Sequence, residues 1–149
     1  MSILEGSNIL ITGGTGSFGQ KCAEYLLAHA KPKRLVVFSR DEQKHVTMSR
    51  TKFPNSRYPQ IRYFVGDVRD SSRLKRALQG IDYVIHAAAM KHVDIAEYNP
   101  TECIRTNIGG AENMTPQGPL LQTDTSAIGR GVQNLGQGVE QVGGALADV

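Results

Sequence analysis

The sequence predicts an α/β fold, a parallel sheet of about four strands with flanking helices. Short apolar runs rich in β-branched and aromatic residues alternate with segments of helical periodicity over residues 1–113. A cluster of glycines stands between the first apolar run and the first helical segment, which is typical of the first turn in such a sheet. Residues 114–149 show neither feature, so we expect them to form a separate part.

Four apolar runs are the predicted strands, over residues 8–12, 34–39, 61–65 and 82–87. Because strands that alternate with helices are joined by right-handed crossovers, we expect them to be parallel, in the order 3-2-1-4. That order leaves the fourth strand as an edge with no neighbour on its outer side. An uncovered apolar edge favours aggregation or pairing with another chain, so we expect low stability or a homo-oligomer.

Four helices are predicted between and after the strands, over residues 18–29, 41–52, 72–78 and 102–113. In the first, Cys22, Leu26 and Leu27 recur at helical spacing. The second begins at Asp41, a residue type that caps helix N-termini. The last follows Pro100.

The composition changes near Met114. Residues 114–149 contain seven of the 16 glycines, no lysine and no aromatic residue, and two prolines near their start end any helix that arrives from upstream. Six apolar residues from Ile128 to Leu146 are spaced by four and three, as in a heptad repeat. The glycines among them favour a fraying amphipathic helix or a disordered segment. We therefore predict a folded domain over residues 1–113 and an unrelated glycine-rich tail over 114–149.

The composition also excludes several classes of protein. The net charge is +3, and the basic residues are scattered along the sequence. They are not interleaved with aromatic residues, and the chain has no tryptophan, so a nucleic-acid-binding groove is not expected. No apolar run approaches the roughly 18 residues that span a bilayer, and the N-terminus lacks a secretory signal. We therefore expect a cytoplasmic chain with no membrane partner. Cys22 and Cys103 have neither disulfide nor metal-ligand spacing, so we expect no metal.

The strongest local signal is the segment Thr12-Gly-Gly-Thr-Gly-Ser-Phe-Gly19, which follows the first strand and opens the first helix. Gly13 allows a tight turn, Gly16 lets backbone amides approach a pyrophosphate, and Gly19 packs the helix close to the sheet. The pyrophosphate would lie at a helix N-terminus, where unpaired N–H groups and the helix dipole favour an anion. The spacing and its placement together predict a dinucleotide site.

The end of the second strand decides which dinucleotide is expected. An NAD site usually presents an acid as the last strand residue. This chain has Ser39 followed by Arg40, with Lys44 one helical turn further on. A hydroxyl and two cations suit a 2′-phosphate, so we predict NADP in preference to NAD. Taken alone, Arg40 and Lys44 would be ordinary solvated side chains, and the glycine loop beside them favours the cofactor interpretation.

Two further segments follow strands at the edge where ligands gather in such sheets. Asp67 lies just after the third strand, where an acid accepts a hydrogen bond from an adenine amino group or simply ends the strand in a turn. Residues 87–92 follow the fourth strand, and Lys91 there can reach phosphate, ribose or substrate. His86 is expected to be a buried strand residue with one satisfied nitrogen.

The segments TGGTGSFG, FSRDEQK, GDVRD, HAAAMKHV and AEYNPTECIRTNI, in this order, resemble the inverting UDP-N-acetylglucosamine 4,6-dehydratases. These are extended short-chain dehydrogenase/reductases of nucleotide-sugar metabolism. The resemblance covers about residues 5–113 and implies a Rossmann fold, tightly held NADP and a UDP-sugar substrate. It implies oxidation at sugar C4, elimination of water across C5 and C6, and reduction at C6, with products used for pseudaminic-acid-type glycans.

The resemblance also assigns roles to residues. Residues 15–18 would contact the pyrophosphate, residues 39–44 the adenosine 2′-phosphate, and Asp67 and Val68 the adenine. Ala87 and Lys91 would line the nicotinamide side, Lys91 also near the substrate, on a floor supported by Thr106 and Asn107. The complete set of predicted cofactor-binding residues is Gly13, Thr15, Gly16, Ser17, Phe18, Gly19, Ser39, Arg40, Asp41, Glu42, Gln43, Lys44, Asp67, Val68, Ala87 and Lys91.

The family's catalytic segments are missing from the sequence. The family has a Ser-Thr-Asp-Lys segment and a Tyr-x-x-x-Lys pair, whereas no tyrosine here is followed four residues later by lysine. Without that tyrosine no general acid/base takes the proton from the sugar hydroxyl, so we predict no catalytic residue and expect a truncated chain that is inactive by itself. Two alternatives remain open, an assembly protein that docks through the heptad tail and a sensor that binds NADP without chemistry.

Overall fold

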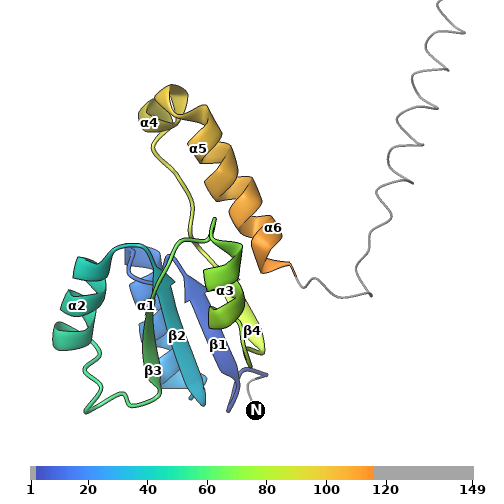
Figure 1. Ribbon diagram of the computed structural model, residues 1–149. Helices are drawn as coiled ribbons and strands as arrows, with labels where there is room; N and C mark the ends of the chain where they lie inside the picture. Colours follow the sequence, from blue (N-terminus) through green and yellow to red (C-terminus); the bar gives the residue numbers. More distant parts are fainter. Residues whose placement is uncertain (1–2, 116–149) are drawn as a thin grey trace, which may run out of the picture. The chain divides into compact units, whose positions relative to one another are not determined.

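The structure is a computed structural model, and it describes residues 3–115. The predicted heptad of the glycine-rich tail lies outside the described residues. The strands are β1 (Asn8–Thr12), β2 (Arg34–Ser39), β3 (Ile61–Val65) and β4 (Tyr83–His86). They form a parallel four-stranded sheet in the order β3-β2-β1-β4 (Figure 1), which confirms the predicted topology.

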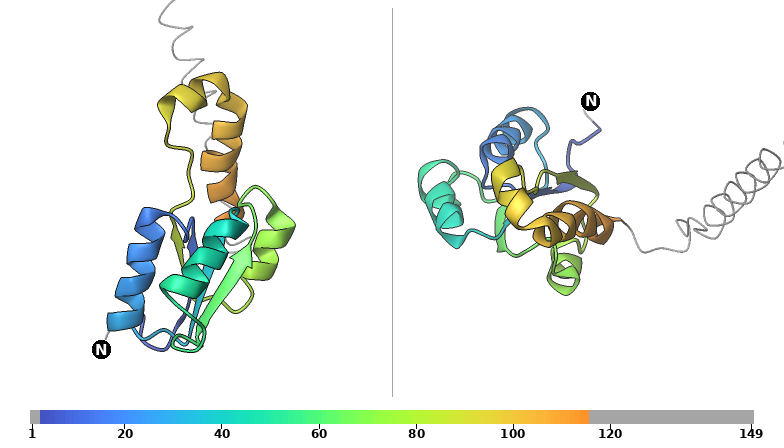
Figure 2. Two further views of the ribbon diagram at one scale, coloured as in Figure 1. Left: turned by 90° about the vertical axis from the view of Figure 1, so that its left-hand side faces the viewer. Right: turned by 90° about the horizontal axis from the view of Figure 1, so that it is seen from above.

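Two layers of helix enclose the sheet. The helices α1 (Ser17–His29) and α2 (Glu42–Thr51) lie on one face, and α3 (Ser71–Ala77) lies on the other (Figure 2). This follows from right-handed crossovers, because the chain moves from β1 through β2 to β3 in one direction and then returns across the sheet to β4. Asp41 caps α2 as expected, since its side chain accepts a hydrogen bond from the Lys44 N–H at 2.9 Å.

Alternation along β1 and β2 fills two separate hydrophobic cores. Successive side chains of a strand point to opposite faces, so every second residue belongs to the same core. The core beneath α1 and α2 contains Ile9, Ile11, Ala23, Leu26, Leu35, Val37 and Met48. The core beneath α3 contains Leu10, Val36, Phe38, Val68, Leu74 and Ala77.

The helical segment after β4 differs from the prediction. A short helix, α4 (Val93–Tyr98), precedes a continuous helical run made of α5 (Pro100–Ile104), the π-helical turn η1 (Arg105–Gly109) and α6 (Gly110–Met114) (Figure 1). The run begins at Pro100 because proline suits the first turn of a helix, not at residue 102 as expected. The sequence analysis missed α4, because its six residues are too few to show a helical period.

The strand β4 is an open edge, as expected from the order of the strands. It pairs with β1 alone among the described strands. Tyr83 and Val84 are accordingly 38% and 37% exposed, whereas Ile9, Leu10 and Ile11 of β1 are fully buried. No helix within residues 3–115 is long and apolar enough to cross a membrane.

Candidate functional site

A cleft of about 580 Å³ lies at the carboxyl edge of the sheet. It is lined by the glycine loop after β1, by the segments that follow β2, β3 and β4, and by one residue of η1. Ten of the sixteen predicted cofactor-binding residues line it: Gly13, Thr15, Gly16, Ser39, Arg40, Asp41, Lys44, Val68, Ala87 and Lys91. The sheet therefore brings segments far apart in the sequence to a single concave surface, at the edge where open α/β sheets bind ligands.

The other six predicted residues, Ser17, Phe18, Gly19, Glu42, Gln43 and Asp67, do not line the cleft. Phe18 is 60% exposed, and Gly19 is buried beneath the loop. Conversely, the cleft lining includes residues that the sequence analysis did not assign to the cofactor: Phe38, Gly66, Ala88, Ala89, Met90, His92, Ile95 and Thr106. Thr106 was expected in the floor, and Gly66, Ala88, Ala89, Met90 and His92 lie in segments that the sequence analysis placed at this edge, whereas no pattern marks Phe38 or Ile95.

The glycine loop is packed so tightly that two of its glycines have no room for a side chain. Gly13 has φ +65°, and a Cβ there would lie 2.9 Å from the backbone of Ala87. A Cβ on Gly19 would lie 2.5 Å from the carbonyl oxygen of Gly13. Because of these contacts, the loop turns sharply and the N-terminus of α1 begins at the cleft. The first N–H groups of a helix have no partner within it, and the N-cap Gly16 supplies no side-chain cap, which suits an anion at this end.

A buried chain of polar side chains supports the loop from behind. The hydroxyl oxygens of Thr15 and Ser39 are 2.7 Å apart, and Nε2 of His45 lies 3.2 Å from both the Oγ and the carbonyl oxygen of Ser39. Thr15 and His45 are only 5% and 4% exposed. Burial lowers the pKa of His45, although its hydrogen bond to Ser39 and the charge of Asp41 act in the opposite direction. The sequence analysis missed His45, whose only signal is its place on the buried face of α2.

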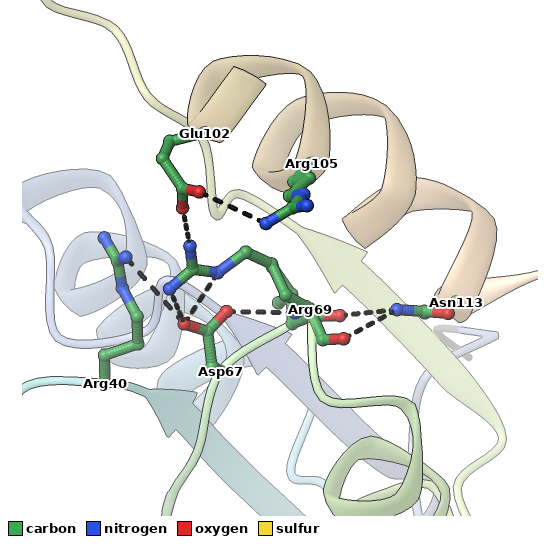
Figure 3. Close-up of polar contacts among 7 residues, drawn as sticks. Arg40, Asp67, Arg69, Glu102, Arg105 and Asn113 are labelled. Atoms are coloured by element: carbon green, nitrogen blue, oxygen red, sulfur yellow. Dashed lines mark hydrogen bonds and ion pairs between the residues drawn. The ribbon is translucent and has the colours of Figure 1, made fainter. Parts of the chain in front are cut away.

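An ion-pair network surrounds Asp67 beside the cleft (Figure 3). The guanidinium of Arg69 bonds to Asp67 at 2.6 Å and 3.0 Å and also pairs with Glu102, which in turn contacts Arg105. Arg40 is 3.9 Å from the same carboxylate, and its side chain is 59% exposed. Burial raises the pKa of the Asp67 carboxyl, but the hydrogen bonds and charge of Arg69, with Arg40, outweigh burial and lower it overall.

The segment after β4 is held in place from two sides. The hydroxyl of Thr12 accepts hydrogen bonds from the N–H groups of Ala87 and Ala88 at 3.1 Å and 3.3 Å. The Asn107 side chain accepts from the N–H of Met90 at 2.8 Å and donates to its carbonyl at 3.1 Å. Because Asn107 belongs to η1, the π-turn fixes the floor of the cleft.

Thr106 is buried, and its hydroxyl has no hydrogen-bond partner among the described residues, although it lines the cleft. The prediction that His86 is buried is wrong, because β4 is an edge strand and the residue is exposed. One nitrogen is satisfied as expected, since Nδ1 lies 2.7 Å from the Thr12 hydroxyl. Within residues 3–115 no group of His, Cys, Asp or Glu side chains could hold a metal ion.

The cleft fits the adenosine and pyrophosphate portions of a dinucleotide. The glycine loop offers backbone where a Cβ would intrude, and the start of α1 offers N–H groups. Thr106 lines the cleft, and its buried hydroxyl has no hydrogen-bond partner within residues 3–115. Ser39, Arg40 and Lys44 stand together at the end of β2 and the start of α2. These are the donors and cations that phosphate and ribose oxygens require.

Known nucleotide-sugar enzymes are similar to this chain over about three quarters of its length. The chain is 54% identical over 112 residues to a UDP-N-acetylglucosamine 4,6-dehydratase (inverting) of Campylobacter jejuni, which covers 75% of this chain and 32% of that protein. It is 45% identical over 109 residues to a UDP-glucose 4-epimerase of Rickettsia bellii, covering 71% of this chain and 31% of that protein. The chain therefore spans about a third of the length of the curated relatives it matches.

Solved structures share the fold. The protein Pen from Bacillus thuringiensis matches with a TM-score of 0.70 and 42% identity, over 75% of this chain and 34% of Pen. A double mutant of the dTDP-glucose 4,6-dehydratase DesIV of Streptomyces venezuelae, solved with NAD bound, matches with a TM-score of 0.59 and 28% identity, over 72% of this chain and 34% of DesIV. A family model described as polysaccharide biosynthesis protein matches residues 9–122. By this match, and by the sheet and glycine loop described above, the chain belongs to the polysaccharide biosynthesis protein family.

Proposed function

We propose that this chain is the N-terminal, NADP-binding part of a UDP-N-acetylglucosamine 4,6-dehydratase. The observation that carries the proposal is the cleft at the carboxyl edge, which joins the glycine loop to Ser39, Arg40 and Lys44. The 54% identity to an inverting dehydratase supports the choice of parent enzyme. We assign residues 1–113 to the cofactor-binding half-domain and residues 114–149 to a separate tail.

The preference for NADP rests on the charges beside the ribose position. The strand β2 ends at Ser39, so no carboxylate occupies the place from which NAD sites bind the ribose hydroxyls. The nearby Asp41 is engaged as the cap of α2 and lies 3.6 Å from the ammonium group of Lys44. Asp67 is held by Arg69. Arg40 and Lys44 are exposed and held only by long ion pairs of 3.9 Å and 3.6 Å, so both can turn to a dianionic 2′-phosphate.

Arg40 has to leave Asp67 in order to contact a phosphate. The 3.9 Å separation and the exposure of the side chain make this pair weak, because exposed ion pairs contribute about 0–1 kcal/mol. A charge-assisted bond to phosphate is shorter and stronger. Asp67 keeps Arg69 as its partner when Arg40 moves, so the exchange leaves no carboxylate unpaired.

The chain's own residues hold the cofactor in this proposal. The start of α1 receives the pyrophosphate, Val68 with the adjoining Asp67 lies beside the adenine, and the segment of Ala87 to Lys91 lies on the nicotinamide side, with Lys91 also near the sugar nucleotide. When bound, NADP supplies the hydride acceptor for sugar oxidation and the hydride donor for the later reduction. No tyrosine of the chain is followed four residues later by lysine, so we assign no proton transfer to these residues.

A calorimetric titration of the purified chain with NADP and with NAD tests the proposal. We expect NADP to bind with a dissociation constant on the order of micromolar and NAD to bind much more weakly. Arg40→Ala should weaken NADP binding and leave NAD binding nearly unchanged. The matched control is Arg76→Ala, which removes the same charge from an exposed position of α3 outside the cleft. Equal affinities for the two nucleotides would refute the NADP assignment, and no binding of either would refute the site.

The same proposal places the chain in the cytoplasm, with UDP-sugars as partners of the parent enzyme in a route to pseudaminic-acid-type glycans. Within residues 3–115 the outer edge of β4 has no neighbouring strand, which supports self-association, because its N–H and C=O groups can pair with a second strand. Sedimentation velocity over a range of concentrations measures this directly. A single monomeric species at all concentrations would contradict self-association.

A further inference from the structure

We infer that His45 is a positioning residue, whose ring donates from Nε2 to Ser39 and so leaves one hydroxyl proton of the Ser39–Thr15 pair free for a ligand oxygen in the cleft. The inference rests on the proposed function, since the ligand oxygen would belong to the 2′-phosphate of the cofactor. His45 itself does not line the cleft, and it acts through Ser39 and Thr15, which do.

The geometry links three elements in one buried chain. His45 belongs to α2, Ser39 ends β2, and Thr15 lies in the glycine loop. The contacts are 2.7 Å between the two hydroxyl oxygens and 3.2 Å from Nε2 of His45 to the Ser39 hydroxyl. Thr15 and His45 are almost completely buried, whereas Ser39 between them is half-buried and faces the cleft.

The surroundings of the ring decide which nitrogen carries the proton. Nε2 faces two acceptors on Ser39, the hydroxyl and the carbonyl oxygen, each at 3.2 Å. Nδ1 is buried and has no hydrogen-bond partner among the described residues, and the Tyr63 ring packs edge-on against the imidazole. A carbonyl oxygen can only accept, so the bond to it requires a proton on Nε2. A proton on Nδ1 would instead be a buried N–H without an acceptor, which is rare in native proteins.

The tautomer determines whether the hydroxyl pair can donate to a ligand. With the proton on Nε2, the ring donates to Ser39, one hydroxyl proton bridges Ser39 and Thr15, and the second proton is free to point into the cleft. With the proton on Nδ1, Ser39 would donate to Nε2 and Thr15 would donate to Ser39, so no proton would remain. Phosphate oxygens only accept, so only the first arrangement offers a donor to the cofactor.

Nuclear magnetic resonance of the ligand-free chain measures the tautomer. Two-bond correlations between ring nitrogens and carbon-bound protons distinguish a protonated nitrogen from an unprotonated one. We expect His45 to be neutral at pH 7 with the proton on Nε2. A proton on Nδ1 would overturn the inference, and this readout needs neither a cofactor nor a variant.

Two variants measure the consequence for binding. His45→Leu removes the donor and fills the buried position with an apolar side chain, whereas His45→Gln supplies an amide N–H that can donate to Ser39 in place of the ring. We expect His45→Leu to weaken NADP binding roughly threefold to tenfold, with a smaller effect on NAD, and His45→Gln to restore most of the loss. A purely structural role would weaken both nucleotides equally, and that result would overturn the inference.

The outcomes separate this inference from the proposed function. Circular dichroism first establishes whether each variant is folded. If His45→Leu is unfolded, the tautomer of His45 in the unmodified chain tests the inference by itself. Failure of the unmodified chain to bind either nucleotide defeats the proposed function. Normal NADP binding together with a proton on Nδ1 overturns this inference alone.

Discussion

Replacing Gly19 by alanine tests the tight packing of the glycine loop against α1. A Cβ at this position would lie 2.5 Å from the Gly13 carbonyl oxygen and 2.5 Å from Cα of Gly14, both of them backbone atoms that cannot rotate away. Overpacking of this kind costs about 1–3 kcal/mol. Alanine also favours the helix over glycine by about 1 kcal/mol, which offsets part of the loss.

Gly109→Ala is the matched control. Gly109 has helical backbone angles in η1, and nothing lies within 4 Å of the Cβ that the substitution adds. This variant receives the same helical gain without the overpacking, so its free energy of unfolding should rise by about 0.5–1 kcal/mol. The two variants should therefore differ by about 1–3 kcal/mol, which is the cost of the contact with the loop.

Urea denaturation followed by circular dichroism measures both variants against the unmodified chain. Equal dependence on urea in all three shows that the midpoints report stability rather than a change in the unfolded state. If Gly19→Ala is as stable as Gly109→Ala, the loop does not press against α1 as described, and the explanation of its shape fails.

Three further predictions concern the cleft and its supports. Arg69→Ala leaves the Asp67 carboxylate without its main partner. Its negative charge then disfavours the 2′-phosphate that only NADP carries, so calorimetry should show a larger loss of affinity for NADP than for NAD. Equal losses would contradict this electrostatic explanation. His45 has a pKa lowered by burial, so its contribution to stability is present above the unfolded value of 6.5 and is lost as the pH falls below it. As the pH is lowered from 7 to 5, the denaturation midpoint should therefore fall less steeply in His45→Gln than in the unmodified chain. An unchanged slope would show that another group causes the pH dependence. Asn107→Ala removes both side-chain bonds to the Met90 backbone, at a cost of about 1–3 kcal/mol, so trypsin should cleave faster after the neighbouring Lys91. Cleavage at the unmodified rate would mean that other contacts hold this segment.

The sheet could be predicted because its signals are local. The apolar run of Asn8–Thr12 and the glycines after it give a strand and a turn without knowledge of the rest of the chain. The strand order then follows from the handedness of crossovers. In contrast, α4 was missed because a helix of six residues is too short to show a helical period in the sequence. The π-turn at Arg105–Gly109 has no sequence signal that distinguishes it from an ordinary helix.

The residues of the candidate site could be predicted only where they belong to a recognisable sequence motif. The glycine loop and Ser39, Arg40 and Lys44 were named from the sequence, and they line one cleft. The contact between Arg69 and Glu102 joins residues 33 positions apart, and no pattern in either segment indicates it. The polar chain from His45 to Thr15 likewise exists only after α2 has packed onto the sheet, so it depends on tertiary structure.

The two hydrophobic cores share the same central strands, and this determines how the domain should open. Because β1 and β2 contribute alternate residues to both cores, neither core can come apart while the other stays intact. The edge strand β4 and the helix α4 contain no buried residue and should belong to the least protected part of the structure. Amide hydrogen exchange should therefore show β1 and β2 as a single slowly exchanging cooperative unit, with β4 and α4 opening first. Such partial opening would expose the floor of the cleft while the glycine loop remains folded.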